Sequence, residues 1–141
     1  MLKNVPPDIT PDLLLTLAEM GHGDRLAVVD RNFPAYAKQL PVHPLPGLTI
    51  PAALRAVLAL LPVDTFEEPP VHFMTPDGEP DTRFEVHDEA LSVMTEIEGR
   101  PITGRGVERT PFYDLAATAY AVVTTTETRP YACFVITKGV L

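Results

Sequence analysis

The sequence contains a single cysteine, Cys133, which excludes an internal disulfide framework. It has no apolar run approaching the roughly 20 residues that cross a bilayer, and no pattern of a secretory leader. Positive charge is also scarce, because 11 Lys and Arg stand against 19 Asp and Glu, giving a net charge of −8. This balance disfavours nucleic acid and anionic membranes as partners. Together these absences predict a cytoplasmic protein.

Metal-binding patterns are missing as well. The four histidines have no ligand-like spacing, and with one cysteine a zinc site is not expected. Cys133 itself stands between Ala132 and Phe134 in an apolar segment, where a thiol is usually inert. We therefore expect no metal and no cofactor.

Short apolar runs alternate with amphipathic segments along the chain. Strands are predicted at residues 26–29, 71–74, 120–125 and 133–137, with a less regular extended segment at 42–45. Runs without polar alternation are typical of strands that are covered on both faces. The sequence therefore predicts an α/β fold, a single three-layer domain over residues 1–141 with a mainly parallel sheet flanked by helices.

Three helix starts share one device, a threonine followed closely by a proline. Thr10 is expected to open a helix that runs to about Gly21, Thr49 one over residues 52–61, and Thr110 one over residues 112–119. A weaker amphipathic helix is predicted at residues 82–97. The segment 99–106 reads as a loop because glycines bound it.

The segment from residue 19 to residue 34 is the most informative part of the chain. Its first turn holds His22 between Gly21 and Gly23, which allow the backbone to bend sharply. The buried run at residues 26–29 then delivers Asp30 at its carboxyl end, the edge of an open α/β sheet at which ligands bind. If the two side chains are within hydrogen-bond reach, Asp30 fixes the tautomer of His22 or binds a ligand hydroxyl.

Several short motifs occur in the order of one known family. They are Met1-Leu-Lys3, Ile9-Thr-Pro-Asp-Leu-Leu14, Ala18-Glu-Met-Gly-His-Gly-Asp24, Asp30-Arg-Asn-Phe-Pro34, Leu60-Leu-Pro-Val-Asp-Thr-Phe66, Glu108-Arg109 with Phe112-Tyr113, and Pro130-Tyr131 with Lys138-Gly-Val140. Through these segments, spread over nearly the whole chain, it resembles the L-fucose mutarotase and D-ribose pyranase family of sugar-anomer isomerases. The fucose branch is the nearer one, because Arg109 stands where ribose-type members carry a histidine.

The resemblance implies a mutarotase without a cofactor, acting on L-fucose or a similar monosaccharide. In such a reaction the anomeric hydroxyl loses a proton, the ring oxygen gains one, and the aldehyde recloses on its other face. An imidazole suits these transfers because its unperturbed pKa is about 6.5. The matching positions imply catalytic roles for His22, Asp30 and Tyr131. They imply substrate-binding roles for Arg109, Tyr113, Asp64 and Cys133. The resemblance also implies a homo-oligomer, from dimer to decamer, with sites near subunit interfaces.

Most of these residues also have a structural interpretation. His22 could be a local hydrogen-bonding group beside the helix end, and Asp30 could cap the turn that follows it. Asp64 could cap a loop instead of binding a sugar hydroxyl, and Asp24 is expected to satisfy loop amides. Arg109 could form a surface ion pair, Tyr113 could belong to the core, and Cys133 could be a core strand residue.

Two positions depart from the family pattern. Cys133 replaces an asparagine, and a thiol cannot both donate and accept as a carboxamide does. Thr126 replaces a glycine that would allow close backbone approach. These changes leave the substrate open, and they keep two other classes of protein in view. One is a non-catalytic sugar-binding or transport-associated protein, and the other is an α/β scaffold protein.

Overall fold

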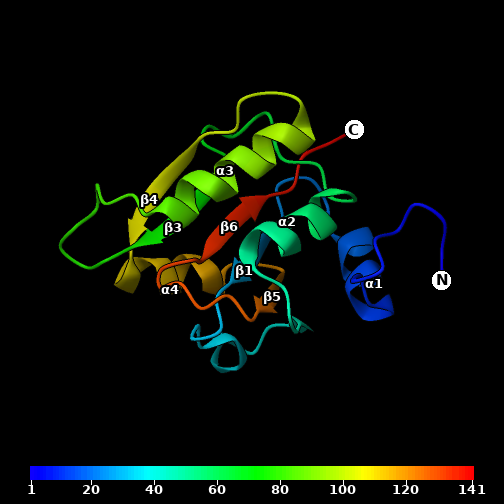
Figure 1. Cartoon of the computed structure of the whole chain (residues 1–141), viewed down its shortest axis with the longest axis horizontal. Helices are drawn as coiled ribbons and strands as arrows, with labels where there is room; N and C mark the ends of the chain where they lie inside the picture. The colour runs from blue at the N-terminus through cyan, green and yellow to red at the C-terminus, as the bar shows by residue number, and fades with distance from the viewer.

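A mixed sheet of six strands forms the middle layer of the structure, a computed structural model that describes residues Met1–Leu141 (Figure 1). The strands are β1 (Arg25–Val29), β2 (Val42–Leu45), β3 (Val71–Thr75), β4 (Gly104–Glu108), β5 (Ala121–Thr125) and β6 (Phe134–Thr137). They lie in the order β2-β5-β1-β6-β3-β4. Only β6 is antiparallel to its neighbours, β1 and β3, so the other five strands share one direction. The predicted mainly parallel sheet is confirmed.

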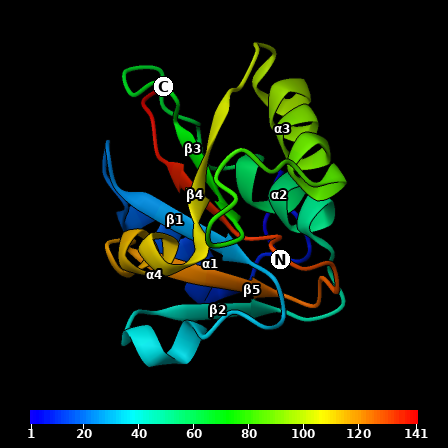
Figure 2. The ribbon, with the colours of Figure 1, turned by 90° about the vertical axis from the view of Figure 1, so that its left-hand side faces the viewer.

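Helices cover both faces of this sheet, as Figure 2 shows from the side. They are α1 (Pro11–Glu19), α2 (Ile50–Leu58), α3 (Glu85–Glu98) and α4 (Arg109–Ala117), with a 3₁₀ turn, η1 (Ala35–Lys38), before β2. The first three pack with one face of the sheet in a large apolar core, whereas α4 and η1 share a smaller core with the opposite face. The three predicted layers are therefore present. No helix combines the length and the apolar character needed to cross a membrane.

The residues of β1 alternate between the two cores, which explains why this strand reads as a continuous apolar run. Leu26 and Val28 belong to the large core, and Ala27 and Val29 belong to the smaller one. All four side chains are fully buried. Burial on both faces removes the polar alternation that marks a half-exposed strand.

The segment predicted as a loop at residues 99–106 instead enters the edge strand β4. Glycine is rare in strands, and this strand contains two. Here they are needed for space, because a Cβ on Gly106 would stand 2.7 Å from the Pro80 carbonyl oxygen and one on Gly104 about 3.2 Å from the Phe73 ring. Close packing therefore requires glycine at these two positions, and the glycines are the reason that the sequence did not indicate a strand here.

The three threonine-based helix starts have different outcomes. The Thr10 hydroxyl accepts a hydrogen bond from the Leu13 amide at 3.2 Å, as predicted. Thr49 does precede α2, but its side chain makes no capping bond. The third helix begins one residue before Thr110, whose hydroxyl instead donates to the Asp77 carboxylate at 2.8 Å.

The cap that Thr49 does not provide comes from Glu127, a residue 77 positions from its partner. The buried Glu127 carboxylate accepts from the Ile50 amide at 3.2 Å and from the Thr128 and Arg129 amides at 3.0 and 3.1 Å. The Arg129 guanidinium also donates to it through Nε and Nη2, each at 3.0 Å. These bonds, led by the one from the Arg129 side chain, lower the pKa of Glu127 to about 2 against the opposing effect of burial.

We predict that Glu127→Gln destabilises the protein at pH 7 and that the difference vanishes in acid. Because the folded-state pKa lies below the ordinary value of 4.5, the carboxylate stabilises the fold above that value and loses its effect as the pH falls toward 2. Loss of charge-assisted hydrogen bonds should cost about 2 kcal/mol.

Urea unfolding measured at pH 7 and at low pH tests this prediction. Glu96→Gln is the control, since Glu96 pairs with Arg55 at the exposed surface and its removal should leave the unfolding midpoint unchanged. A stability difference between wild type and Glu127→Gln that stays constant with pH would contradict the assigned role.

Candidate active site

The two residues expected to work together, His22 and Asp30, lie at opposite ends of β1. His22 precedes the strand and Asp30 follows it, with five strand residues between their turns. Each strand residue advances the chain by about 3.3 Å, so the two side chains stand on opposite sides of the sheet, beyond the two ends of β1. The condition of hydrogen-bond reach between them is therefore not met within one chain. Each residue instead belongs to a cluster of its own.

The first cluster, the His22 cluster, comprises His22, Asp64 and Phe66. The His22 Nε2 atom lies 2.9 Å from Asp64 Oδ1, and its ring centroid lies 5.0 Å from that of Phe66. The His22 side chain is 43 % exposed, whereas that of Asp64 is 3 % exposed. Asp64, not Asp30, is thus the carboxylate that orients this imidazole.

Hydrogen bonds keep the Asp64 carboxylate ionised. Burial raises its pKa, but the Glu67 and Phe66 amides and the His22 ring donate to it, and the net result is a pKa below the ordinary value. An ionised carboxylate can only accept, so His22 donates from Nε2 and leaves Nδ1 without a proton in the neutral ring. The cluster therefore presents a partly exposed nitrogen that can accept a proton.

Asp64 also has the loop-capping role that the sequence left open. Its second oxygen, Oδ2, accepts from the Glu67 amide at 2.8 Å. Both oxygens are thus engaged inside the chain. Asp24 likewise accepts from the Gly21 amide at 2.7 Å, which confirms its expected role in satisfying loop amides.

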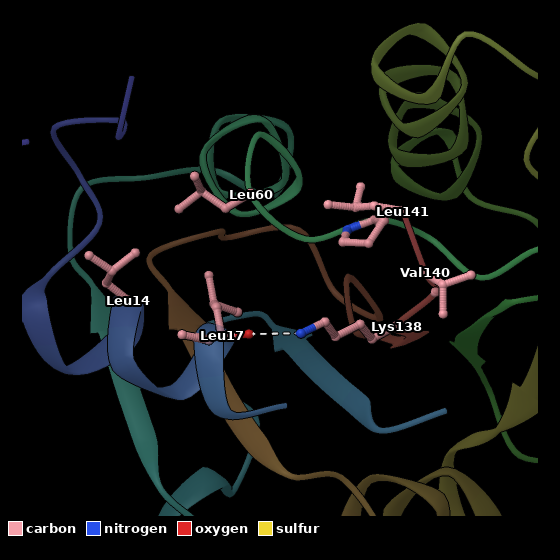
Figure 3. A pocket seen from close by; sticks show the side chains of 9 residues that line it. Leu14, Leu17, Leu60, Lys138, Val140 and Leu141 are labelled. Atoms are coloured by element: carbon pink, nitrogen blue, oxygen red, sulfur yellow. Dashed lines mark hydrogen bonds between the residues drawn. The ribbon is translucent and has the colours of Figure 1, made fainter. Parts of the chain in front are cut away.

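Lys138 fixes the end of α1 next to the His22 loop. Its Nζ atom donates to the Leu17 carbonyl at 3.0 Å, the bond drawn in Figure 3, and also to the Met20 carbonyl. A cation at this position also interacts favourably with the negative end of the helix dipole. The backbone of the loop is held too, because the Gly23 amide donates to the Lys138 carbonyl at 2.9 Å.

Lys138 borders an apolar cavity of about 450 Å³ between α1 and the C-terminal residues, which Figure 3 shows. Leucine side chains dominate its wall, including Leu14, Leu17 and Leu60. The Lys138 ammonium is already bound to α1, so few polar groups remain to orient a sugar. This cavity lacks the polar convergence of a carbohydrate site.

The second cluster, the Asp30 pocket, lies at the carboxyl edge of the parallel strands. It is a cavity of about 210 Å³ lined by Asp30, Asn32, Phe33, Met74, Arg109, Tyr113, Pro130, Tyr131 and Cys133. Five of the seven predicted site residues meet here, and only His22 and Asp64 are elsewhere. The lining comes from the ends of β1 and β3, the first turn of α4 and the chain leading into β6.

Asp30 forms the polar floor of this pocket. The side chain is buried, and its Oδ1 atom accepts from the Asn32 amide at 2.9 Å. Cys133 lies next to Asp30 and is only 1 % exposed. Cys133 is therefore both a buried residue directly before β6 and part of the pocket lining. Burial, reinforced by the Asp30 charge, raises the pKa of the Cys133 thiol well above its ordinary value. The thiol therefore stays protonated.

Aromatic rings and an arginine form the walls. The Arg109 Nε atom donates to Asp77 at 3.3 Å, and its guanidinium carbon lies 5.9 Å from the Tyr113 ring centroid. Tyr113 contacts Phe33 at 5.7 Å between centroids. Arg109 thus makes the surface ion pair that was the alternative to sugar binding, yet it also lines the pocket.

Four lining residues were not among the predicted site residues, namely Asn32, Phe33, Met74 and Pro130. Met74 lies near the end of β3, and the rule that located Asp30 at a strand end could have found it. Asn32 belongs to the turn that follows Asp30, where its backbone amide binds the carboxylate. Asn32 itself has no sequence signal that separates it from ordinary turn residues.

Known proteins resemble this chain over nearly its full length. The sequence profile of the RbsD / FucU transport protein family matches residues 3–141. The chain is 38% identical over 140 residues to an L-fucose mutarotase of Actinobacillus pleuropneumoniae serotype 5b (strain L20), covering 99% of this chain and 97% of that one. It is 40% identical over 147 residues to the human fucose mutarotase, covering 99% and 94%.

A solved structure shares the fold and contains a sugar. The fucose mutarotase from Streptococcus pneumoniae in complex with L-fucose superposes with a TM-score of 0.88, at 33% identity and 99% coverage of both chains. The fold is that of a small α/β protein of the kind that handles sugars. This chain belongs to the RbsD / FucU transport protein family.

We predict that Asp64→Asn changes the tautomer of His22. In the wild type the carboxylate selects the ring with the proton on Nε2, whereas an amide can donate as well as accept and so imposes no choice. Long-range ¹H–¹⁵N NMR should show the Nε2-protonated form in the wild type and a mixture in the variant. The ring of His43, which pairs with Thr16, serves as an internal control. An unchanged His22 spectrum would contradict the assignment.

Proposed function

We propose that this protein is a monosaccharide mutarotase that interconverts the anomers of L-fucose or a closely similar sugar. The observation that carries the proposal is the gathering of Asp30, Arg109, Tyr113, Tyr131 and Cys133 in one pocket at the strand ends. Relatives at 38% and 40% identity over almost the full chain are named L-fucose mutarotase and fucose mutarotase. The reaction class is that of a cofactor-independent isomerase.

The chemistry assigns a part to each polar group. The anomeric hydroxyl gives up its proton to a base while an acid protonates the ring oxygen, the bond from the anomeric carbon to the ring oxygen breaks, and the open aldehyde recloses on its other face. His22 Nδ1 and the Tyr131 hydroxyl are the groups we assign to these transfers, and Asp30 binds the sugar hydroxyls. Positioned acid and base groups contribute roughly 10²- to 10⁴-fold each.

Arg109 and Tyr113 complete the sugar-binding wall in this proposal. The guanidinium is always charged and only donates, so it suits a sugar oxygen without taking part in proton transfer. Its bond to Asp77 at 3.3 Å is long and exposed, which leaves other N–H donors of the guanidinium for a ligand. Asp64 acts through His22 and not on the sugar.

The separation of His22 from the Asp30 pocket requires a second subunit. We propose a homo-oligomer in which His22 of one subunit enters the Asp30 pocket of another. The exposed His22 side chain and the neighbouring Phe66, which is 75% exposed, support such a contact surface. When the contact joins two different surfaces, successive subunits form a ring if the rotation between them closes the assembly. In a two-fold dimer the same two surfaces can meet twice. The cytoplasmic location stays a prediction.

The alternative function is a sugar-binding protein without catalysis, associated with transport. One observation favours it: within one chain the pocket lacks an imidazole, so a monomer would bind a sugar without His22 to transfer a proton. Saturation-transfer NMR on free sugars separates the two functions. Catalysis appears as exchange between anomer signals, and binding alone as line broadening without exchange.

We predict that His22→Ala and Asp30→Asn each slow anomer exchange of L-fucose by at least about 100-fold while the fold is retained. If sites are shared between subunits, assembling the two inactive variants together should restore activity, because random pairing yields about a quarter of sites with both residues intact. The exchange rate is measured by saturation-transfer NMR after co-expression.

Asp81→Asn is the control, since Asp81 is an exposed residue outside both clusters. No recovery in the mixed assembly would contradict sharing between subunits. Unchanged exchange in both single variants, with matched circular dichroism, would contradict the roles of His22 in proton transfer and of Asp30 in sugar binding.

We also predict that Cys133→Asn raises the rate on L-fucose relative to D-ribose by about fivefold, since hydrogen bonds to a hydroxyl discriminate strongly. The new amide can donate to the adjacent Asp30 and reach the pocket, so it need not be buried without a partner. Cys133→Ala, which removes the thiol without adding an amide, is the control. A lower melting temperature with unaltered sugar preference would assign Cys133 to the core alone.

A further inference from the structure

His87 lies buried behind the Asp30 pocket and contacts the backbone of Tyr131. It belongs to the first turn of α3 and has no exposed surface. Its Nε2 atom is 2.9 Å from the Tyr131 carbonyl oxygen, and its Nδ1 atom is 3.1 Å from the Phe84 amide nitrogen. Because the amide donates, Nδ1 must accept, and the proton on Nε2 therefore points at Tyr131.

Tyr131 needs such an anchor because its backbone is left-handed. Its φ angle is +60°, a region that residues with a side chain enter rarely. The Tyr131 ring stacks on Phe84 with centroids 5.4 Å apart and planes 9° from parallel. The Phe84 ring thus stacks on Tyr131, and the Phe84 amide donates to His87. Since His87 in turn contacts the Tyr131 carbonyl, the three residues form one closed unit.

The surroundings of His87 keep its ring neutral. Phe73 and Phe134 flank the imidazole at 4.3 and 5.9 Å between centroids, and Phe84 lies on a third side at 5.5 Å. Burial lowers the pKa of His87, with Arg83 acting in the same direction and Asp88 in the opposite one. A neutral ring keeps one acceptor and one donor, the pattern that its two partners require.

We propose that His87 is a positioning residue that holds Tyr131 in the left-handed conformation and so sets the place of its side chain in the Asp30 pocket. His87 does not line the pocket and so does not touch the sugar. The inference rests on the proposed function only through the role of Tyr131, and the geometry it asserts can be measured without any catalysis.

Two isosteric variants separate this role from a merely structural one. In His87→Gln the amide nitrogen can occupy the place of Nε2 and keep the bond to Tyr131. In His87→Asn the shorter side chain can occupy the place of Nδ1 and keep only the bond from Phe84. A residue that merely satisfied the start of α3 would be replaced better by asparagine, whereas a residue that positions Tyr131 would be replaced better by glutamine.

The expected result is that His87→Asn lowers kcat for L-fucose exchange by at least about tenfold with a smaller change in KM, because a small displacement of a reacting group is costly. His87→Gln should stay within about threefold of the wild type. In the double variant His87→Asn with Tyr131→Phe, exchange should be no slower than in Tyr131→Phe alone, because both changes act through one hydroxyl.

The NMR shifts of the Tyr131 ring protons, which report its stacking on Phe84, provide a readout that needs no activity. They should move in His87→Asn and stay in place in His87→Gln. If wild type shows no anomer exchange, the proposed function fails, while these shifts and L-fucose titration still test the role of His87. Equal effects of the two substitutions, or unmoved Tyr131 signals in His87→Asn, would overturn the inference.

Discussion

The pairing of β1 with β6 is the constraint on which both clusters depend. His22 precedes β1 and Asp30 follows it, while Tyr131 precedes the antiparallel β6 and Lys138 follows it. Each end of this pair therefore brings together two segments that are far apart in sequence. A slip of one residue in the pairing would turn every side chain of β6 to the other face and disturb both ends together. The pairing of β1 with β6 thus positions both the His22 cluster and the Asp30 pocket.

The buried carboxylates differ in how many of their acceptor positions the protein itself uses. Glu127 receives five hydrogen bonds from Ile50, Thr128 and Arg129, and both oxygens of Asp64 have partners. Such saturation suits groups that hold backbone in place. Asp30 accepts one backbone bond and borders the cavity, so it retains capacity for a ligand hydroxyl. Satisfaction of hydrogen bonds, more than residue type, separates the supporting acids from the one that we propose binds sugar.

Much of the fold was predictable from apolar runs, because burial of β1 on both faces leaves a direct trace in sequence. The strand β4 was not, since its glycines reflect the nearby Phe73 ring and Pro80 carbonyl and not a local preference. Five of the predicted site residues lie together in one pocket at the ends of the elements, and their roles there stay predictions. The sequence offered Asp30 only conditionally as the partner of His22, and the carboxylate that His22 does contact could not be predicted because it is 42 residues away.

The bond from Lys138 to the end of α1 has a kinetic consequence. It joins residues 121 positions apart, and β1 pairs only with β5 and β6, both from the last part of the chain. The centre of the sheet therefore closes only after nearly the whole polypeptide is available. Contacts of such long sequence separation slow folding, because the entropy of closing the intervening loop is lost before they form. During synthesis, β1 therefore stays without its strand partners until most of the chain has been made.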